Sequence, residues 1–216
     1  KEYTDKTKLQ EYDISTDKTL TVPDDSHTQR PELYYYEGTV WYRNRFNYEM
    51  KNDKRVFLHF GAVNYEAIVF LNGKEIGQHI GGFTPFNFEV TNALKNGENS
   101  LVVKVDNKRK LEAVPTINTD WWNYGGITRE VTLIETPATF VRDYYVQLKK
   151  SDKNLIQGWI QLDGKQLAKS LKLEIPELKI VQRLTPDANG YAAFEIKAKP
   201  LLWSPENPKL YKVNIP

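Results

Sequence analysis

Apolar and polar side chains alternate along many short segments of this chain. In the segment 38–46, mainly apolar residues fall on one face, while Trp41, Arg43 and Arg45 fall on the other. A period of two is typical of a strand with one buried face. The same pattern, bounded by turn residues, predicts further strands at 55–60, 67–71, 74–78, 86–90, 101–106 and 129–135.

Turn residues separate these segments. Asn72-Gly73 lies between two predicted strands and predicts a type I′ hairpin turn. Weaker patterns predict an edge strand at 19–23 and a loop at 24–32. A single helical turn, capped by a threonine, is predicted at 91–95. No segment has the helical periodicity that repeated βαβ units would need. We therefore predict an all-β chain that begins with an antiparallel sandwich or jelly roll.

The strand pattern restarts after 136–139, a Thr-Pro-Ala-Thr segment that we interpret as a linker. Strands are predicted at 141–148, 155–162, 171–175, 179–184, 192–197 and 210–215. We therefore expect two domains, over residues 1–137 and 138–216. The second is shorter than the ~100 residues of an immunoglobulin-like sandwich. We expect it to be truncated at its C-terminal end, as part of a longer protein.

The composition changes this picture little. The 216 residues include 30 Lys and Arg against 28 Asp and Glu, a net charge of +2, and the basic residues are scattered. Because the charge is small and not clustered, we expect no nucleic acid as a partner. We expect no membrane partner either, since no apolar run is long enough to span a bilayer. The absence of cysteine excludes disulfides, thiol nucleophiles and cysteine-ligated metals. For localisation we favour a periplasmic or secreted protein over a cytoplasmic one.

The richest candidate chemistry lies at 118–131, NTDWWNYGGITREV. Its two glycines permit positive φ and a sharp bend. Asp120 directly precedes Trp121 and Trp122. Aromatic faces can stack on a sugar ring while a carboxylate accepts hydrogen bonds from its hydroxyls. In the alternative interpretation, the aromatic rings only pack a corner of the sandwich, and Asp120 caps its own turn.

Other polar residues suggest weaker sites. The three histidines lack the spacing of a zinc site: His27, His59 and His79. Two pairs could offer oxygen ligands to a hard cation, although loop acids are usually only solvated: Asp24-Asp25 and Asp106-Asn107. We expect neither a metal nor a cofactor.

Arg43 and Arg45 share a strand face with Trp41 and could bind an acidic sugar such as a glucuronide. Cross-strand ion pairs with acidic residues are the alternative explanation for these arginines. No motif or spacing suggests a Ser–His–Asp set, a nucleophile elbow or a phosphate-binding loop.

The segment WNYGGITREV, residues 122–131, resembles the end of the first domain of glycoside hydrolase family 2, the β-galactosidase and β-glucuronidase group. Four further segments resemble the family in the same order, at 36–43, 58–74, 79–86 and 203–211. Single elements such as Asn-Gly are weak signals, but the ordered set is specific and covers most of residues 34–216.

This resemblance implies a jelly-roll (galactose-binding-like) sugar-binding domain, an immunoglobulin-like domain and then a TIM barrel with the active site. The barrel is absent from this sequence. Family members are retaining glycosidases that use two glutamates, and the acid/base follows an asparagine. This sequence has no Asn-Glu dipeptide. We therefore expect no catalytic residue here and no hydrolysis by these residues alone. The parent protein is expected to be an enzyme of the β-galactosidase or β-glucuronidase type.

The resemblance also implies that Asp120 reaches into the barrel's pocket and binds a hydroxyl of the terminal sugar. Trp121 and Trp122 would shape the rim or pack beneath the loop. The leading hypothesis is a non-catalytic fragment that braces the missing barrel and contributes a loop to the pocket for a terminal β-glycoside. Two alternatives remain: an autonomous carbohydrate-binding module joined to an adhesive immunoglobulin-like domain, and a pure interaction scaffold.

Overall fold

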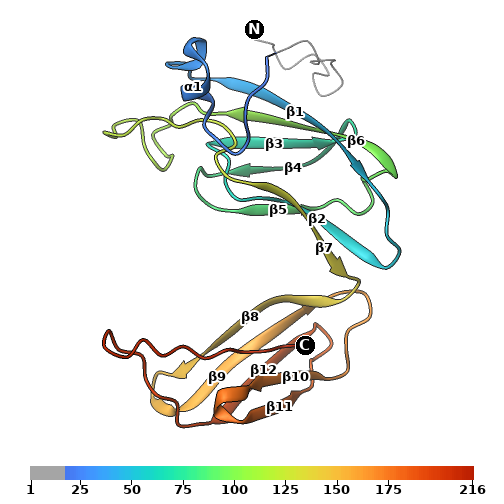
Figure 1. The fold of residues 1–216 in the computed structure, drawn as a ribbon, viewed down its shortest axis with the longest axis vertical. Helices are drawn as coiled ribbons and strands as arrows, with labels where there is room; N and C mark the ends of the chain where they lie inside the picture. The colour runs from blue at the N-terminus through green and yellow to red at the C-terminus, as the bar shows by residue number, and fades with distance from the viewer. Residues whose placement is uncertain (1–17) are drawn as a thin grey trace. The chain divides into compact units, whose positions relative to one another are not determined.

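The computed structural model describes residues 18–216, whose regular secondary structure is almost entirely β-strand (Figure 1). The chain divides into two compact units between Glu135 and Thr136. Strands that are neighbours in the sheets run antiparallel, so the prediction of an all-β chain of antiparallel sheets is confirmed.

The first unit contains two sheets and two short helices. One sheet has the order β1 (Thr39–Tyr48), β6 (Gly97–Asp106), β3 (Glu66–Leu71) and β4 (Lys74–Ile80). The other has the order β5 (Phe86–Glu89), β2 (Lys54–Phe60) and β7 (Val131–Pro137). Before β1 come the α-helix α1 (Ser26–Gln29) and the 3-10 helix η2 (Pro31–Leu33).

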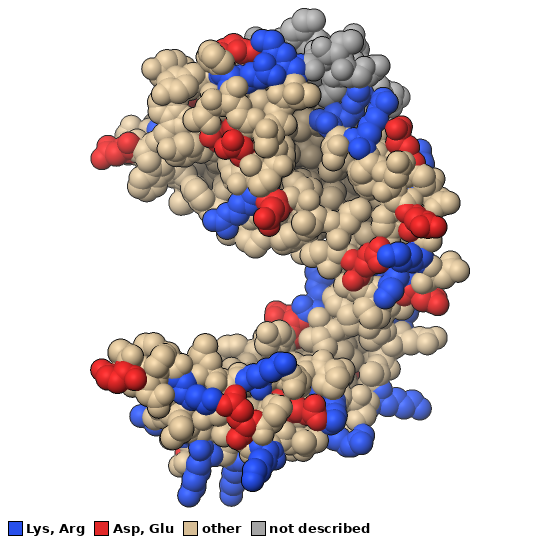
Figure 2. All heavy atoms as spheres, in the orientation of Figure 1, with Lys and Arg blue, Asp and Glu red and all other residues tan. Residues whose placement is uncertain are grey.

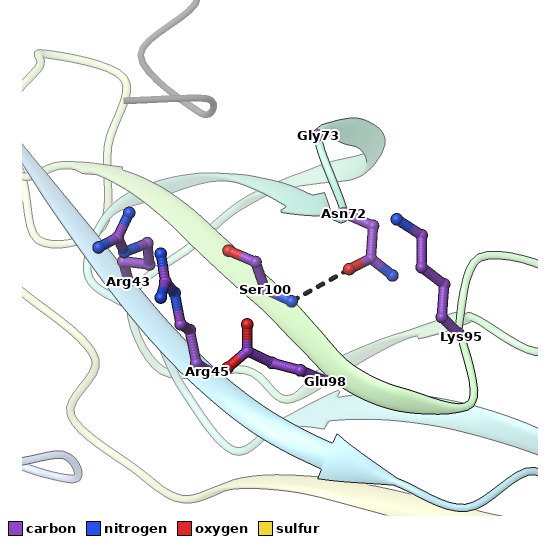
Figure 3. Close-up of a pocket in the computed structure, with 7 residues that line it drawn as sticks. All are labelled: Arg43, Arg45, Asn72, Gly73, Lys95, Glu98 and Ser100. Atoms are coloured by element: carbon purple, nitrogen blue, oxygen red, sulfur yellow. Dashed lines mark hydrogen bonds between the residues drawn. The ribbon is translucent and has the colours of Figure 1, made fainter. Parts of the chain in front are cut away.

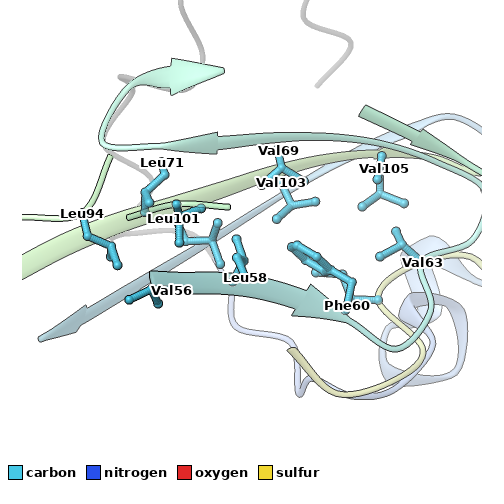
Figure 4. Packing of buried hydrophobic residues seen from close by; sticks show 13 residues of the cluster. Val56, Leu58, Phe60, Val63, Val69, Leu71, Leu94, Leu101, Val103 and Val105 are labelled. Atoms are coloured by element: carbon cyan, nitrogen blue, oxygen red, sulfur yellow. The ribbon is translucent and has the colours of Figure 1, made fainter. Parts of the chain in front are cut away.

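The core of this unit lies between the two sheets. Alternate side chains of β2 point toward those of β3 and β6, as Figure 4 shows, and Phe60 at the end of β2 is fully buried. In β3, Val69 and Leu71 are buried, while Phe70 between them faces the other side of the sheet and is only half-buried. The period-two pattern thus predicts correctly which faces form the core.

The turn between β3 and β4 is the predicted hairpin. Asn72 has φ of 53° and Gly73 has φ of 81°. Both central residues of a type I′ turn need positive φ, which Asn and Gly adopt most easily. The hairpin therefore follows directly from the local sequence.

The second unit also has two sheets. The larger has the order β12 (Tyr191–Lys197), β9 (Asp152–Asp163) and β8 (Phe140–Lys149). The smaller pairs β10 (Leu171–Ile175) with β11 (Ile180–Leu184), and the 3-10 helix η3 (Pro176–Leu178) connects them. Their apolar side chains form a separate core around Ile160, Leu173 and Ile175. The immunoglobulin-like character of this unit remains a prediction.

Two predictions near the N-terminus are wrong. Residues 19–23 form no strand, because the backbone of Thr21 bonds to the side chain of Gln29 through both its N–H and its C=O. The predicted loop at 24–32 contains α1, whose first turn is capped by the carboxylate of Asp25. Asp25 accepts from the backbone nitrogens of His27 and Thr28 at 2.9 Å each, which is ordinary N-cap chemistry.

The predicted helical turn at 91–95 forms as one turn, in which Val90 O accepts from Ala93 N at 2.9 Å and from Leu94 N at 3.0 Å. Thr91 does not cap it, because its hydroxyl accepts the backbone N–H of Val56 instead. Asn99 binds both the N–H and the C=O of Lys95, so the chain cannot continue as a helix.

The predicted strand at 210–215 is also wrong. This segment makes only one isolated bridge, in which Asn214 and Glu174 exchange two backbone hydrogen bonds of 2.9 Å. Prolines at 208 and 216 flank the segment and cannot donate to a ladder.

Charges are mixed on the surface. Figure 2 shows Lys and Arg interspersed with Asp and Glu over the visible face of each unit, as the net charge of +2 suggests. Among residues 18–216, no helix is long and apolar enough to cross a membrane.

Candidate functional site

The connection from β6 to β7 carries the predicted site. We call residues 118–126 the aromatic loop. Its end pairs with Asn64 in an isolated antiparallel bridge: Asn64 N donates to Gly126 O at 2.8 Å, and Gly126 N donates to Asn64 O at 2.9 Å. The side-chain Nδ2 of Asn64 also donates to Tyr124 O at 2.7 Å. Asn64 therefore holds the loop through its backbone and its side chain.

A second anchor is the buried ring of His27, which is 3% exposed. Gly125 N donates to its Nδ1 at 3.1 Å. The other ring nitrogen, Nε2, lies 2.8 Å from Tyr36 O and 2.9 Å from Asn107 Nδ2. Ser26 completes the anchor, because its backbone nitrogen and its hydroxyl both donate to Gly125 O.

Asn107, directly after β6, is the third anchor. Its backbone oxygen accepts from Asn123 Nδ2 at 2.8 Å, and its Oδ1 accepts from Gly38 N at 2.7 Å. Its Nδ2 donates to Tyr36 O at 3.2 Å. Asn107 is buried, so these bonds satisfy an otherwise costly amide.

The two glycines of the loop are needed for different reasons. Gly126 has φ of 119°, a conformation that glycine permits. Gly125 does not use the positive φ that a glycine permits. A Cβ on Gly125 would instead lie 2.5 Å from Asn107 Nδ2. Gly125 is therefore required for close packing against the third anchor.

Beside the loop lies a cleft of about 450 Å³. Its walls are the aromatic loop, the residues after β2, the turn before β5 and the start of the chain toward β7. The lining residues are Ala62, Asn64, Gly82, Phe83, Pro115, Trp121, Trp122, Asn123, Tyr124, Thr128 and Arg129. The structure thus brings Trp121 and Trp122 together in one wall. Asp120 is not among the lining residues.

The two tryptophans have different environments. Trp121 is 59% exposed at the rim, and its backbone oxygen accepts from Arg109 Nη2 at 2.7 Å. Trp122 is partly buried, with its ring centroid 4.7 Å from that of Tyr34 and 5.6 Å from that of Tyr35. Trp121 can therefore offer a ring face to a ligand, while Trp122 fixes the loop against the segment before β1.

Asp120 lies on the exposed side of the loop. Its carboxylate makes no hydrogen bond or ion pair with the part of the chain that the structure describes. By contrast, the carboxylate of Asp106 accepts from Thr39 Oγ1 and Lys108 N. A carboxylate on a well-anchored loop with all its acceptor sites available is suited to binding hydroxyl groups.

The alternative candidates from the sequence have protein partners. Asp25 and Asp106 accept hydrogen bonds from their own surroundings, and Asn107 anchors the loop. Within residues 18–216, no group of three or more His, Asp or Glu side chains is arranged to hold a metal ion. His79 stacks on Phe86 with ring centroids 4.1 Å apart.

A family model matches residues 5–137 and is described as "Glycosyl hydrolases family 2, sugar binding domain". A putative β-glucuronidase of Formosa agariphila is 28% identical over 84% of this chain and 23% of its own length. A β-galactosidase of Thermoanaerobacter pseudethanolicus is 28% identical over 95% of this chain and 30% of its own length. This chain therefore spans less than a third of these relatives.

Solved structures give the same likeness. A Bifidobacterium dentium β-glucuronidase complexed with coumarin-3-O-glucuronide has a TM-score of 0.78 and 26% identity, covering 90% of this chain and 39% of that one. A β-glucuronidase from an uncultured Clostridium sp. has a TM-score of 0.79 and 28% identity, covering 97% of this chain and 39% of that one.

Proposed function

The chain belongs to glycosyl hydrolases family 2, whose sugar-binding domain it carries, and on this basis we propose that it is the non-catalytic N-terminal part of a β-glucuronidase- or β-galactosidase-type enzyme. In this proposal residues 1–137 are the sugar-binding domain and 138–216 an immunoglobulin-like domain. Together they brace a catalytic barrel that follows in the full-length protein.

The observation that carries this proposal is the contrast within the aromatic loop. Its end is held by Asn64, His27 and Asn107, so its backbone is ordered before any ligand arrives. Asp120, a few residues earlier, has an unused carboxylate. A site that is ordered in advance loses less entropy on binding, which favours affinity and correct orientation.

Asp120 would bind the terminal sugar as an ionised acceptor. Each hydroxyl that donates to it makes a charge-assisted hydrogen bond, which is stronger than a bond between neutral groups. Trp121 would cover the apolar face of the sugar or of the group attached to it. The chain's own residues would therefore position the substrate, and the bond cleavage would take place on the barrel.

The test uses the full-length parent enzyme. Asp120→Asn should lower kcat/KM by roughly tenfold or more, since a charged acceptor is worth about 1.5–3 kcal/mol. Asp143→Asn is the matched control, because Asp143 is also exposed but lies on β8, where its carboxylate accepts the backbone N–H of Tyr144. An unchanged kcat/KM for Asp120→Asn would refute the proposed role and favour a pure scaffold.

A second candidate function is an autonomous carbohydrate-binding module. The observation that favours it is the cleft of about 450 Å³, which is lined entirely by residues of the first unit. Titration of the 216-residue chain with β-glycosides separates the two functions. Under the leading proposal the heat of binding is not measurable, whereas binding that Trp121→Ala abolishes would favour the module.

A further inference from the structure

The strands β8, β9 and β12 lie side by side in the second unit (Figure 1), and their sheet has one face on the core. Along β9, Ile156, Ile160 and Leu162 are buried in that core. Successive side chains of a strand point to opposite faces, so the residues between these three lie on the other face. We call it the outer face. It carries three aromatic side chains that are only partly buried: Tyr145, Trp159 and Tyr191.

The three aromatic side chains form a ladder across the sheet. Trp159 on β9 lies directly opposite Tyr145 on β8, with ring centroids 6.3 Å apart and 21° between the ring planes. Tyr191 on β12 lies diagonally beside Trp159, with centroids 6.0 Å apart and 29° between the planes. Neighbouring strands are ~4.8 Å apart, so the ladder crosses roughly 10 Å of the sheet. We call these three residues the aromatic ladder.

Two small residues shape the ladder. A Cβ on Gly158 would overlap the backbone oxygen of Tyr145, so a glycine is needed for the close approach of β8 to β9 at this point. Ala193 lies directly opposite Trp159 on β12. Its side chain is a single methyl group, which leaves the indole without a bulky neighbour at that position. The backbone thus sets both the spacing of the rings and the room beside Trp159.

Side-chain amides elsewhere in the chain are used by the fold. At the β3–β4 turn, Asn72 Oδ1 accepts from Ser100 N at 3.1 Å, as Figure 3 shows. On the outer face itself, Gln161 Nε2 donates to Leu162 O at 2.9 Å and to Asn189 O at 2.7 Å. These amides hold the chain together and have little capacity left for a ligand.

The polar groups beside the ladder are free by comparison. Gln147 and Gln157 lie directly opposite each other on the outer face, one position along from the ladder. Within residues 18–216, neither amide makes a side-chain hydrogen bond. The same is true of the three polar ring groups of the ladder, which are the two tyrosine hydroxyls and the indole N–H. Apolar rings and unused hydrogen-bonding groups therefore lie together on one surface.

Little unbalanced charge lies next to the ladder. On one side, Lys149 Nζ is 2.5 Å from Glu195 Oε2, so these two charges neutralise each other. On the other side lies Asp143, an anionic group that would repel an anionic ligand. A nucleic acid would need a cationic groove beside the rings on which its bases stack. The outer face therefore favours an uncharged ligand.

The ladder is small for an interface with a second copy of the chain. Tyr145 and Tyr191 are only 43% and 41% exposed. An aromatic side chain offers 150–250 Å² when it is buried completely, so three rings at this exposure offer roughly 300 Å², against ~800 Å² per partner in a stable protein interface. A narrow row of rings fits a narrow ligand instead.

We propose that the aromatic ladder binds a linear neutral oligosaccharide on the outer face of the second unit. The rings would cover the apolar C–H faces of successive sugars, which releases water from both surfaces. The amides of Gln147 and Gln157 would exchange hydrogen bonds with sugar hydroxyls, since an amide offers both donors and an acceptor. Aromatic walls with a few polar groups are the usual composition of a site for a small polar ligand. This inference does not rest on the proposed role of Asp120.

The test is calorimetric titration of the 216-residue chain with cellohexaose, laminarihexaose and methyl β-glucoside. A hexasaccharide can contact the whole ladder, whereas a single sugar can contact only one ring. Heat of binding from at least one hexasaccharide, with none from methyl β-glucoside, supports the proposal. Added salt should leave the affinity unchanged, because no ion pair forms. No heat from either hexasaccharide, or equal affinity for methyl β-glucoside, overturns it.

Variants locate the binding. Trp159→Ala and Tyr145→Ala should each weaken it by about fivefold or more, while Tyr145→Phe, which keeps the ring, should weaken it less. Tyr144→Ala is the matched control, because Tyr144 is the adjacent residue of β8 and 59% exposed but points to the opposite face. Trp121→Ala should also have no effect, which separates the ladder from the cleft of the first unit. If Trp159→Ala and Tyr145→Ala bind like the unaltered chain, the ladder is not the site.

Sedimentation velocity examines the alternative occupant, a second copy of the chain. The unaltered chain and Trp159→Ala should sediment alike at the concentrations used for calorimetry. A dimer that Trp159→Ala dissociates would overturn the proposal, because the ladder would then be a protein interface.

Discussion

Gly125 donates its backbone N–H to the imidazole of His27 at 3.1 Å, although the two residues are 98 positions apart in the sequence. This bond connects α1 to the aromatic loop, and Ser26 reinforces it with two further bonds to Gly125. The shape of the candidate sugar-binding loop therefore depends on a segment that precedes the first strand.

Replacement of His27 tests this dependence. His27→Ala leaves the buried N–H of Gly125 without its acceptor, and an unsatisfied buried group costs about 1–3 kcal/mol. We expect a lower urea midpoint for unfolding of the first unit and an altered indole signal of Trp121 in NMR spectra. His79→Ala, which removes a ring stacked on Phe86, should leave that indole signal unchanged. An unaltered indole signal in His27→Ala would show that the loop does not need this anchor.

Two glycine substitutions separate steric packing from backbone conformation. Gly125→Ala places a Cβ 2.5 Å from Asn107 Nδ2, and such overpacking costs about 1–3 kcal/mol. Gly97 has φ of 90°, and no atom lies within 4 Å of the place that an added methyl group would take. Gly97→Ala should therefore cost only the backbone strain, about 1 kcal/mol. Chemical denaturation of both variants measures the difference. Equal losses would argue against the close contact with Asn107.

The core between the two sheets of the first unit should be sensitive to truncation. Phe60 is fully buried at the end of β2, so Phe60→Ala should cost about 3–5 kcal/mol. Phe83 is 56% exposed in the turn before β5, and Phe83→Ala should change stability by less than ~1 kcal/mol. Thermal unfolding followed by circular dichroism compares the two, and similar melting temperatures would contradict this assignment of the core.

An ion pair at the end of the first unit should make stability depend on pH. Lys51 Nζ lies 2.8 Å from Glu135 Oε2, and its hydrogen bond lowers the pKa of Glu135 below the ordinary 4.5. The folded state thus binds the proton of the Glu135 carboxyl group less tightly than the unfolded chain does. The pair stabilises the fold fully above about pH 4.5, and this contribution is lost as the pH falls through the lowered pKa.

Lys51→Met removes the partner of Glu135. The variant should be slightly less stable than the unaltered chain near neutral pH, and the difference should shrink toward about pH 3. Urea midpoints at the two pH values give the comparison. Lys153→Met, an exposed lysine in the second unit, is the control and should show no pH-dependent difference. A difference for Lys51→Met that stays constant with pH would exclude the ion pair as its cause.

Local sequence predicts most of this fold. The strands have clear period-two alternation, and Asn72-Gly73 defines its hairpin because positive φ is favoured at just these residue types. The predicted strand at 19–23 fails because a side chain replaces its backbone partners, whereas the one at 210–215 makes only an isolated bridge between flanking prolines. Gln29 takes the hydrogen-bonding groups of Thr21, and Asn99 binds those of Lys95 where the turn at 91–95 ends. No local pattern indicates such bonds.

The candidate site is predicted only in part for the same reason. Its aromatic and glycine residues are contiguous, so the sequence draws attention to Trp121 and Trp122. The anchors are scattered along the chain: His27 lies in α1, Asn64 between β2 and β3, and Asn107 directly after β6. A lone histidine or asparagine in a loop has no periodicity, and only the folded arrangement shows what it binds.

The anchoring of the aromatic loop has a consequence for how this domain can diversify. His27, Asn64 and Asn107 all hold residues 123–125, whereas the preceding tip carries the groups that face outward. Under the role proposed for Asp120 and Trp121, substitutions at the tip would alter ligand preference while the underlying sandwich stays intact. Such a division between a constant base and a variable tip would let one scaffold serve relatives that act on different glycosides.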